Sequence, residues 1–155
     1  MKSMIFYYSK SGKTESLAMK VKEVLGSDIL KVEPEKPYGN WVSSVFRVIR
    51  EKSKTIYPAF CTEIPNLDQY DTVLIGYPIW AGDIPSFFAY FVKKCNLRGK
   101  TVIPFATSGG SGIEPSIKTL KRICPESNVT LQYRYIQAKS DELEQWLKSV
   151  MELPN

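Results

Sequence analysis

The sequence of 155 residues contains no histidine. Histidine is the usual general base at neutral pH and the commonest protein ligand of metals, so Ser-His and Cys-His nucleophile pairs are excluded. The few cysteines, Cys61, Cys95 and Cys124, are widely spaced and odd in number, which favours reduced thiols and a cytoplasmic location over a disulfide framework. No apolar run reaches the roughly 18 residues that span a bilayer, and no signal-peptide cleavage site follows Met1. We therefore expect a function that needs little side-chain acid–base chemistry and involves no membrane span.

Apolar runs that are typical of strands alternate with amphipathic segments that are typical of helices. Strands are predicted over 4–8, 29–32, 72–77, 101–106 and 129–137, and helices over 14–25, 41–52, 85–94, 112–124 and 140–151. This alternation predicts an α/β fold, an open doubly wound parallel sheet with helices on both faces. No linker or repeat interrupts the pattern, so a single domain over 1–155 is expected.

Helical periodicity also predicts which side chains of the helices are buried. The expected inward faces are Leu17, Val21, Val24 and Leu25 in the first helix, Trp41, Val45, Val48 and Ile49 in the second, and Leu143, Trp146, Leu147 and Val150 in the last.

The segment Ser9-Lys10-Ser11-Gly12-Lys13-Thr14 follows the first strand and opens the first helix. Hydroxyls, backbone N–H groups and the positive end of a helix dipole together favour an anion. Gly12-Lys13-Thr14 matches the end of a triphosphate-binding loop, but Tyr7 stands where that motif needs glycine. The strand over 72–76 also ends in glycine instead of a magnesium-binding acid. Two interpretations remain: a monophosphate site with Ser9, Ser11 and Thr14 as hydroxyl donors, or an ordinary turn capped by Ser11.

Two later strands end in unusual loops, and ligands of open parallel sheets bind beyond the carboxyl ends of strands. The first loop, Tyr77-Pro78-Ile79-Trp80-Ala81-Gly82-Asp83, carries a tryptophan that could stack on a planar ligand or simply pack. The second, Thr107-Ser108-Gly109-Gly110-Ser111-Gly112, holds three glycines and two serines. Such a segment is costly to order, which favours close approach of backbone to a ligand. Together the loops predict a site for a phosphate-bearing molecule with a flat polar ring.

These three segments together resemble the flavodoxin family, above all its short bacterial flavodoxin-like branch, and the resemblance covers nearly the whole chain. It implies a five-stranded parallel sheet in the order 2-1-3-4-5 and one non-covalent flavin mononucleotide (FMN). It further implies that the phosphate is held by Ser9, Ser11, Gly12, Lys13 and Thr14. The flavin ring would be flanked by Pro78, Ile79, Trp80, Ala81 and Gly82, and its pyrimidine edge would be held by Ser108, Gly109, Gly110 and Ser111.

The chain departs from the family pattern in its charge and at three positions of the loops, Ser11, Lys13 and Ala81. Lys13 adds a positive charge beside the implied phosphate, and Ala81 stands where the branch commonly carries a second aromatic, which would leave the outer ring face open to substrate. The best-known members are acidic, whereas this chain has a net charge of +5. Residues 85–125 hold seven basic side chains against Glu114 alone. This basic patch is either a solvated surface or one that steers acidic partners; it lacks the features of a nucleic-acid-binding surface.

Three functions are compatible with these features. The first is an oxidoreductase that passes electrons from a nicotinamide, NAD(P)H, to a quinone-like acceptor, and Ala81 and the basic surface favour it. The second is a non-enzymatic electron carrier that serves a redox partner protein, and the third is a flavin-binding regulatory module. Within the less informative segment 34–70, Tyr38, Trp41 and Arg47 could line the flavin edge or pack.

Overall fold

The computed structural model describes residues 1–135 and 140–154. Its centre is a parallel sheet that contains β1 (Ser3–Tyr7), β2 (Asp28–Lys31), β3 (Thr72–Pro78), β4 (Thr101–Thr107), β5 (Asn128–Val129) and β6 (Tyr133–Tyr135). The strand order is β2-β1-β3-β4-β5, with β6 also paired to β4, and every ladder is parallel. The order predicted from the sequence is therefore confirmed.

The last strand of the sheet differs from the continuous strand predicted over 129–137. It is split, because β5 pairs with the start of β4 and β6 with its end. Between them Leu131 has φ +49°, a left-handed conformation that an extended ladder does not accommodate. The Trp146 indole N–H donates to the Leu131 carbonyl at 2.5 Å, which holds this interruption in place. The predicted strand residues 136 and 137 lie outside the described residues.

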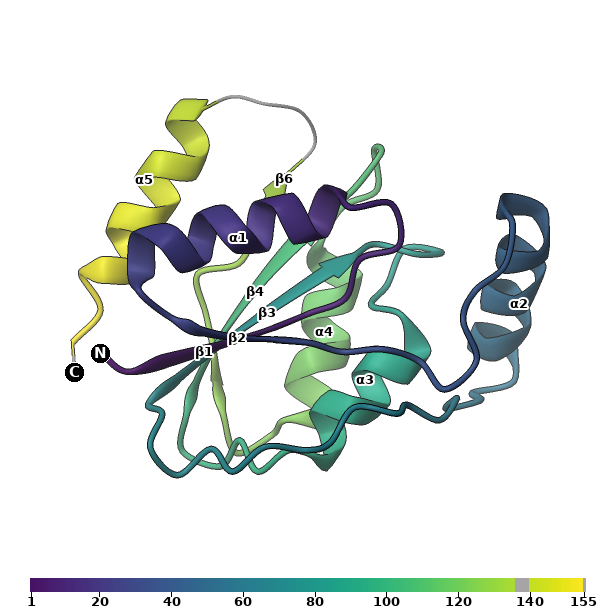
Figure 1. Cartoon of the computed structure of the whole chain (residues 1–155), viewed down its shortest axis with the longest axis horizontal. Coiled ribbons are helices and arrows are strands. Elements are labelled where there is room, and N and C mark those ends of the chain that lie inside the picture. Colours follow the sequence, from purple (N-terminus) through teal and green to yellow (C-terminus); the bar gives the residue numbers. More distant parts are fainter. Residues whose placement is uncertain (136–139, 155) are drawn as a thin grey trace.

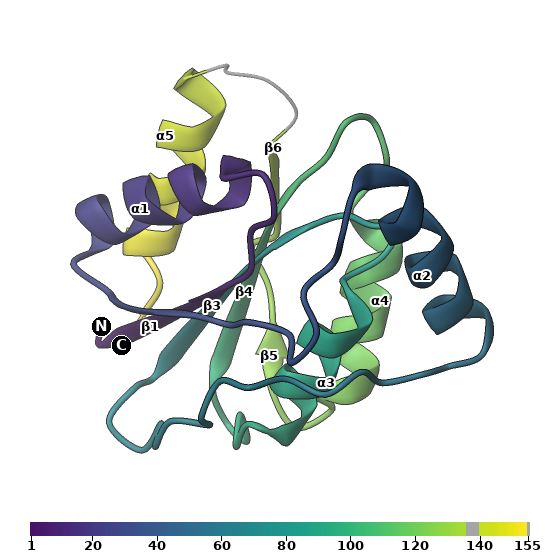
Figure 2. The ribbon, with the colours of Figure 1, turned by 45° about the vertical axis from the view of Figure 1, so that its right-hand side comes forward.

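Helices cover both faces of the sheet (Figures 1 and 2). Helices α1 (Lys13–Leu25) and α5 (Ser140–Met151) pack on one face, and α3 (Ser86–Lys94) and α4 (Glu114–Ile123) on the other. The side chains of β1 alternate accordingly, with Ile5 and Tyr7 in the core beneath α1 and α5, and Met4 and Phe6 in the core beneath α3 and α4. None of the helices in the described part of the chain is long and apolar enough to cross a membrane.

Helix α1 begins and ends at glycines in the left-handed conformation. Gly12 is its N-cap with φ 87°, and Gly26, the stop predicted from the sequence, is its C-cap with φ 64°. Leu17 and Val21 are buried as predicted, but the prediction for Val24 was wrong, because its side chain is 48% exposed. The next residue, Leu25, still packs against the core, so Val24 lies at the edge of the buried face of α1 and not beyond its end.

Helix α2 (Trp41–Ser53) forms where it was predicted, but its expected buried face was mostly wrong. Only Val48 is buried, whereas Trp41 is 77% exposed, Ile49 54% and Val45 36%. The physical reason is the position of α2, which stands apart from the sheet, on the side where β1, β3 and β4 end (Figure 1). Its apolar face is therefore turned toward loops instead of a sheet.

Candidate functional site

The three loops singled out in the sequence meet at the edge of the sheet where β1, β3 and β4 end. They surround a cavity of about 880 Å³. Side chains of α2 and β6 complete its wall, because Trp41 and Tyr135 also line it. The full lining comprises Ser11, Lys13, Trp41, Pro78, Ile79, Trp80, Thr107, Ser108, Gly109 and Tyr135. This edge is where a ligand of an open parallel sheet is expected.

Only one of the three predicted hydroxyl donors of the first loop reaches the cavity wall, and that is Ser11. The Ser9 hydroxyl accepts a hydrogen bond from the Gly12 N–H at 3.0 Å and so shapes the loop. The Thr14 side chain is buried, and its hydroxyl shares a 2.8 Å hydrogen bond with the Thr107 hydroxyl at the end of β4. The pair ties two of the three loops together, and the Thr14 side chain does not line the cavity.

The surroundings of this first loop are electropositive. A smaller cavity of about 320 Å³ adjoins the large one, shares Ser11, Lys13 and Tyr135 with it, and is also lined by Lys20. The first N–H groups of α1 have no partner within the helix and carry the positive end of its dipole. Two lysines and a helix N-terminus therefore act together at one end of the site, which favours an anion there.

A tight turn presents the tryptophan that follows β3. Backbone hydrogen bonds of 2.9 and 3.1 Å join Trp80 and Asp83 in both directions. Ala81 with φ 48° and Gly82 with φ 76° lie between them, as in a type I′ turn. The left-handed φ of Ala81 costs an L-residue about 1 kcal/mol, which shows that the turn is held by its surroundings.

The Asp83 carboxylate anchors the turn to two helices. It accepts hydrogen bonds from the Ile84 N–H at 2.7 Å and from the Thr119 hydroxyl of α4 at 2.9 Å. It also lies 3.6 Å from the Lys52 ammonium of α2, which in addition donates to the Ile84 carbonyl. Burial lowers the pKa of Lys52, although the nearby Asp83 opposes that shift. The turn and α2 are thus fixed relative to one another.

Two tyrosine rings pack against the half-buried Trp80 ring. Its centroid lies 5.4 Å from that of Tyr8 and 4.8 Å from that of Tyr38, both edge to face. The Arg47 guanidinium lies 3.9 Å from the centre of the Tyr38 ring, and the Tyr38 hydroxyl donates to Glu51 at 2.7 Å. Burial, reinforced by Glu51, raises the pKa of Tyr38. The sequence did not decide whether Tyr38, Trp41 and Arg47 line the flavin edge or pack. In the structure Tyr38 packs against Trp80 and Arg47 packs on Tyr38, whereas Trp41 lines the cavity.

The serine–glycine loop after β4 is held by its own hydrogen bonds. The Ser108 hydroxyl donates to the Ser111 carbonyl at 2.8 Å and accepts from the Gly110 N–H at 3.1 Å, while Arg134 donates to the Ser111 carbonyl at 3.0 Å. A Cβ atom added at Gly109 or Gly110 would meet nothing within 4 Å, and neither residue has a left-handed φ. Within the described residues, neither backbone conformation nor packing requires glycine at these two exposed positions.

The structure brings together seven of the fourteen predicted site residues in the wall of the large cavity: Ser11, Lys13, Pro78, Ile79, Trp80, Ser108 and Gly109. Gly12 and Ala81 line adjoining cavities, whereas Ser9, Thr14, Gly82, Gly110 and Ser111 support the loops without lining any of the three. Sequence reasoning missed Lys20, Thr107 and Tyr135 as lining residues. Tyr135 could have been predicted by the argument that gave the three loops, because it lies at the carboxyl end of β6, beside Thr107.

The basic patch lies largely away from this site. Lys93 and Lys94 occupy the last turn of α3, which runs from the cavity edge back toward the amino ends of the strands (Figure 1). Some of its charges have structural partners, since the Lys100 ammonium donates to the Tyr70 carbonyl at 2.7 Å and Arg98 lies 3.6 Å from Glu126. Steering of acidic partners by this surface stays a prediction.

Comparisons with known proteins agree with this architecture. The flavodoxin family model matches residues 2–150. A protein of Bacteroides eggerthii DSM 20697, whose assignment as a flavoprotein is provisional, is 32% identical over 98% of this chain and 99% of its own, with a TM-score of 0.84. A similarly assigned protein of Bacteroides uniformis ATCC 8492 is 33% identical over 95% and 97%, also with a TM-score of 0.84.

A more distant structure, a flavoprotein of Lactobacillus acidophilus NCFM in complex with FMN, is 23% identical over 94% of this chain and 97% of its own, with a TM-score of 0.76. The comparison with curated proteins found no match. The family match runs almost from end to end of the sequence, and the strand order fits it. The chain therefore belongs to the flavodoxin family, and the cofactor that this membership implies is FMN.

Proposed function

We propose that this chain is an FMN-dependent oxidoreductase that takes electrons from NAD(P)H and passes them to a quinone-like acceptor. The observation that carries the proposal is the mixed wall of the large cavity. It combines a cation, Lys13 beside the α1 N-terminus, with an apolar surface at Ile79 and Trp80 and with polar backbone at Gly109.

The residues present fit FMN. Ser11, Lys13 and the first N–H groups of α1 would hold the phosphate, with Ser9 shaping the loop through the Gly12 N–H. The ring would lie against the Pro78–Gly82 segment, and backbone groups of Ser108–Ser111 would hold its pyrimidine edge. The open space above Gly109, where a Cβ would meet nothing within 4 Å, is the feature that such a ring would explain.

The chain contributes binding and positioning more than proton chemistry. The residues that line the cavity include no carboxylate, and the sequence contains no histidine. Bound FMN supplies the ability to accept two electrons and pass them on. The overall reaction balances as NAD(P)H, one proton and a quinone giving NAD(P)⁺ and a hydroquinone, with the two protons of the hydroquinone coming from the hydride donor and the solvent.

The small side chain of Ala81 favours an enzyme over a carrier. It lines a second, apolar cavity of about 330 Å³ that shares Trp41, Ile79 and Trp80 with the large one. A small acceptor would thus have room beside the cofactor. The carrier alternative has its own supporting observation, because the 72% exposed Phe46 of α2 offers apolar surface near the site to a protein partner.

Two measurements on the purified protein test the proposal. Binding of FMN should change its absorbance bands and fluorescence, and unchanged spectra would reject the cofactor assignment. Oxidation of NADH or NADPH with a quinone should then exceed the rate with free FMN. Binding without such turnover would favour the carrier or the regulatory module.

A pair of lysine variants tests the phosphate end of the site. Lys13→Met should weaken FMN binding about threefold to tenfold, because a charge–phosphate contact at an exposed position is worth on the order of 1 kcal/mol. Lys148→Met on α5 makes the same charge change at an exposed position away from the loops and should leave affinity unchanged. Equal affinities of the two variants would place the phosphate elsewhere.

A further inference from the structure

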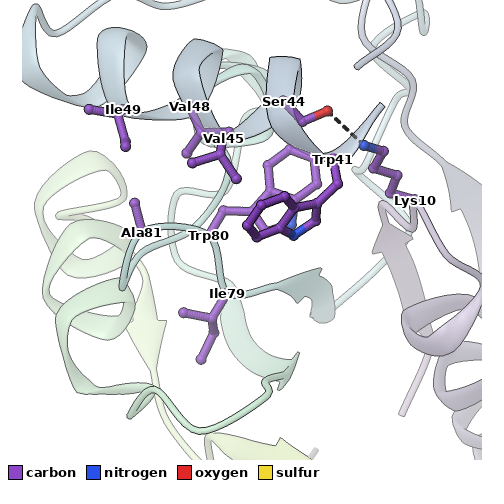
Figure 3. A pocket seen from close by; sticks show the side chains of 9 residues that line it. All are labelled: Lys10, Trp41, Ser44, Val45, Val48, Ile49, Ile79, Trp80 and Ala81. Carbon is purple, nitrogen blue, oxygen red and sulfur yellow. Dashed lines mark hydrogen bonds between the residues drawn. The ribbon is translucent and has the colours of Figure 1, made fainter. Parts of the chain in front are cut away.

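The apolar cavity between α2 and the Trp80 turn has a composition of its own. Its volume is about 330 Å³, and its lining is Lys10, Trp41, Ser44, Val45, Val48, Ile49, Ile79, Trp80 and Ala81. In Figure 3 Val45 and Val48 point from α2 toward Trp80, while Ile49 and Ala81 lie at the end opposite to Lys10. Seven apolar side chains and one cation thus surround a space of the size typical of small-molecule sites, about 300–1,000 Å³.

The polar end of this cavity has hydrogen-bonding capacity to spare. The Lys10 ammonium donates to the Ser44 hydroxyl at 2.6 Å (Figure 3) and to the Gly39 carbonyl at 2.7 Å. These two bonds fix its position, and an ammonium has three donors. Within the described residues, one proton of Lys10 is therefore left for a further acceptor.

Two apolar side chains of this wall, Val45 and Ile49, bury little of their surface in the fold. Ile49 is 54% exposed and Val45 36%, although burial of such side chains is worth about 1.5–3 kcal/mol each. The wall is nevertheless held in position, because the Lys52–Asp83 contact joins α2 to the Trp80 turn. A fixed, apolar and hollow surface is what a ligand site requires.

We propose that this cavity binds a planar aromatic compound that carries an anionic oxygen, such as a hydroxyquinone. The ring would fill the space between Val45, Ile49 and Trp80, and its oxygen would face Lys10. The shared wall of Trp41, Ile79 and Trp80 sets such a ring beside the large cavity. Its role as the electron acceptor rests on the proposed function; its binding does not.

The three tryptophans provide the readout. Trp41 and Trp80 line the cavity, whereas Trp146 stacks on Tyr133 in the core formed with α1 and α5 and serves as an internal reference. Titration of the hydroxynaphthoquinone lawsone into FMN-saturated protein should shift the indole N–H resonances of Trp41 and Trp80 and leave that of Trp146 in place. Loss of all lawsone binding on FMN saturation would overturn the proposal, since lawsone would then occupy the large cavity.

Two matched variants of α2 test the location. Ile49→Glu puts a repelling carboxylate in the cavity wall and should weaken lawsone binding about tenfold or more. Phe46→Glu adds the same charge to the same helix at a 72% exposed residue that does not line the cavity, and should bind lawsone like the wild type. Equal affinities of the two variants would overturn the proposal.

Lys10→Met tests the charge. It should remove the preference for lawsone over menadione, an uncharged methylnaphthoquinone, and an unchanged preference would show that Lys10 does not face the ligand. A separate FMN titration keeps the two proposals apart. FMN binding without lawsone binding overturns this inference alone, whereas lawsone binding without FMN binding overturns the proposed function alone.

Discussion

Gly109→Ala should stabilise the FMN-free protein and weaken FMN binding at the same time. A Cβ atom at Gly109 meets nothing within 4 Å, and the residue has no left-handed φ, so alanine fits without strain. Such a replacement stabilises by about 0.4–1 kcal/mol, because it reduces the conformational entropy of the unfolded chain. For a chain of 155 residues this corresponds to a rise in Tm of about 1–4 °C. The same methyl group would occupy space that we assign to the flavin ring.

The cost of that overlap should be about 1–3 kcal/mol, as for an extra methyl group in a filled core, or about fivefold to 150-fold in Kd. Thermal unfolding by circular dichroism gives the first quantity, and titration of flavin fluorescence gives the second. Gly112→Ala is the control, because its Cβ would meet only the flexible end of the Glu114 side chain. If Gly109→Ala binds FMN within twofold of the wild type, no ligand approaches the backbone there and the reasoning fails.

Three further predictions concern the Trp80 turn and the thiols. Ala81→Gly should leave the free energy of unfolding equal or up to about 1 kcal/mol higher in urea titrations, since it relieves the φ of 48°, whereas Ala81→Val should lower it; a clear loss with glycine would contradict the turn geometry. At pH 8, a thiol reagent should modify exposed Cys61 quickly, and buried Cys95 and Cys124 only after unfolding; fast reaction of all three would contradict their burial. Burial raises the pKa of Cys95 to about 12 and that of Cys124 to about 11, whereas unfolded thiols ionise near pH 8.5. The two buried thiols therefore make their full contribution to stability below about pH 8, and that contribution is lost as the pH rises toward 11–12. The free energy of unfolding measured in urea should fall above about pH 9, and a free energy that does not change with pH would refute this prediction.

The strands of the sheet centre could be predicted closely because their signal is local. The apolar run 72–77 became β3, Thr72–Pro78, and 101–106 became β4, Thr101–Thr107. The edge strand could not be predicted in this way, because the left-handed φ of Leu131 depends on a distant indole N–H. The alternation of apolar residues in the sequence carries no information about the contact between Trp146 and Leu131.

Periodicity shows which side chains share a helix face, but not what that face meets. Trp41, Val45 and Ile49 do share a face with Val48, yet α2 stands beyond the sheet and only Val48 is buried. The site shows the same limit. Its three loops could be predicted, because ligands of open parallel sheets bind beyond the carboxyl ends of the strands. The hydrogen bond between the hydroxyls of Thr14 and Thr107, which are 93 residues apart, could not be inferred from spacing.

Three cationic side chains join helix α2 to the rest of the molecule, and Lys10, Arg47 and Lys52 each donate to an uncharged acceptor across its boundary. Most apolar side chains of its inner face stay partly exposed, so apolar burial adds little to this attachment. Amide hydrogen exchange should therefore reveal α2 as a separate unit of low local stability that opens long before β3 and β4. Among the described contacts across this boundary, only the Lys52–Asp83 pair joins two charges, so the exchange should respond weakly to salt, whereas a ligand bound against α2 should slow it.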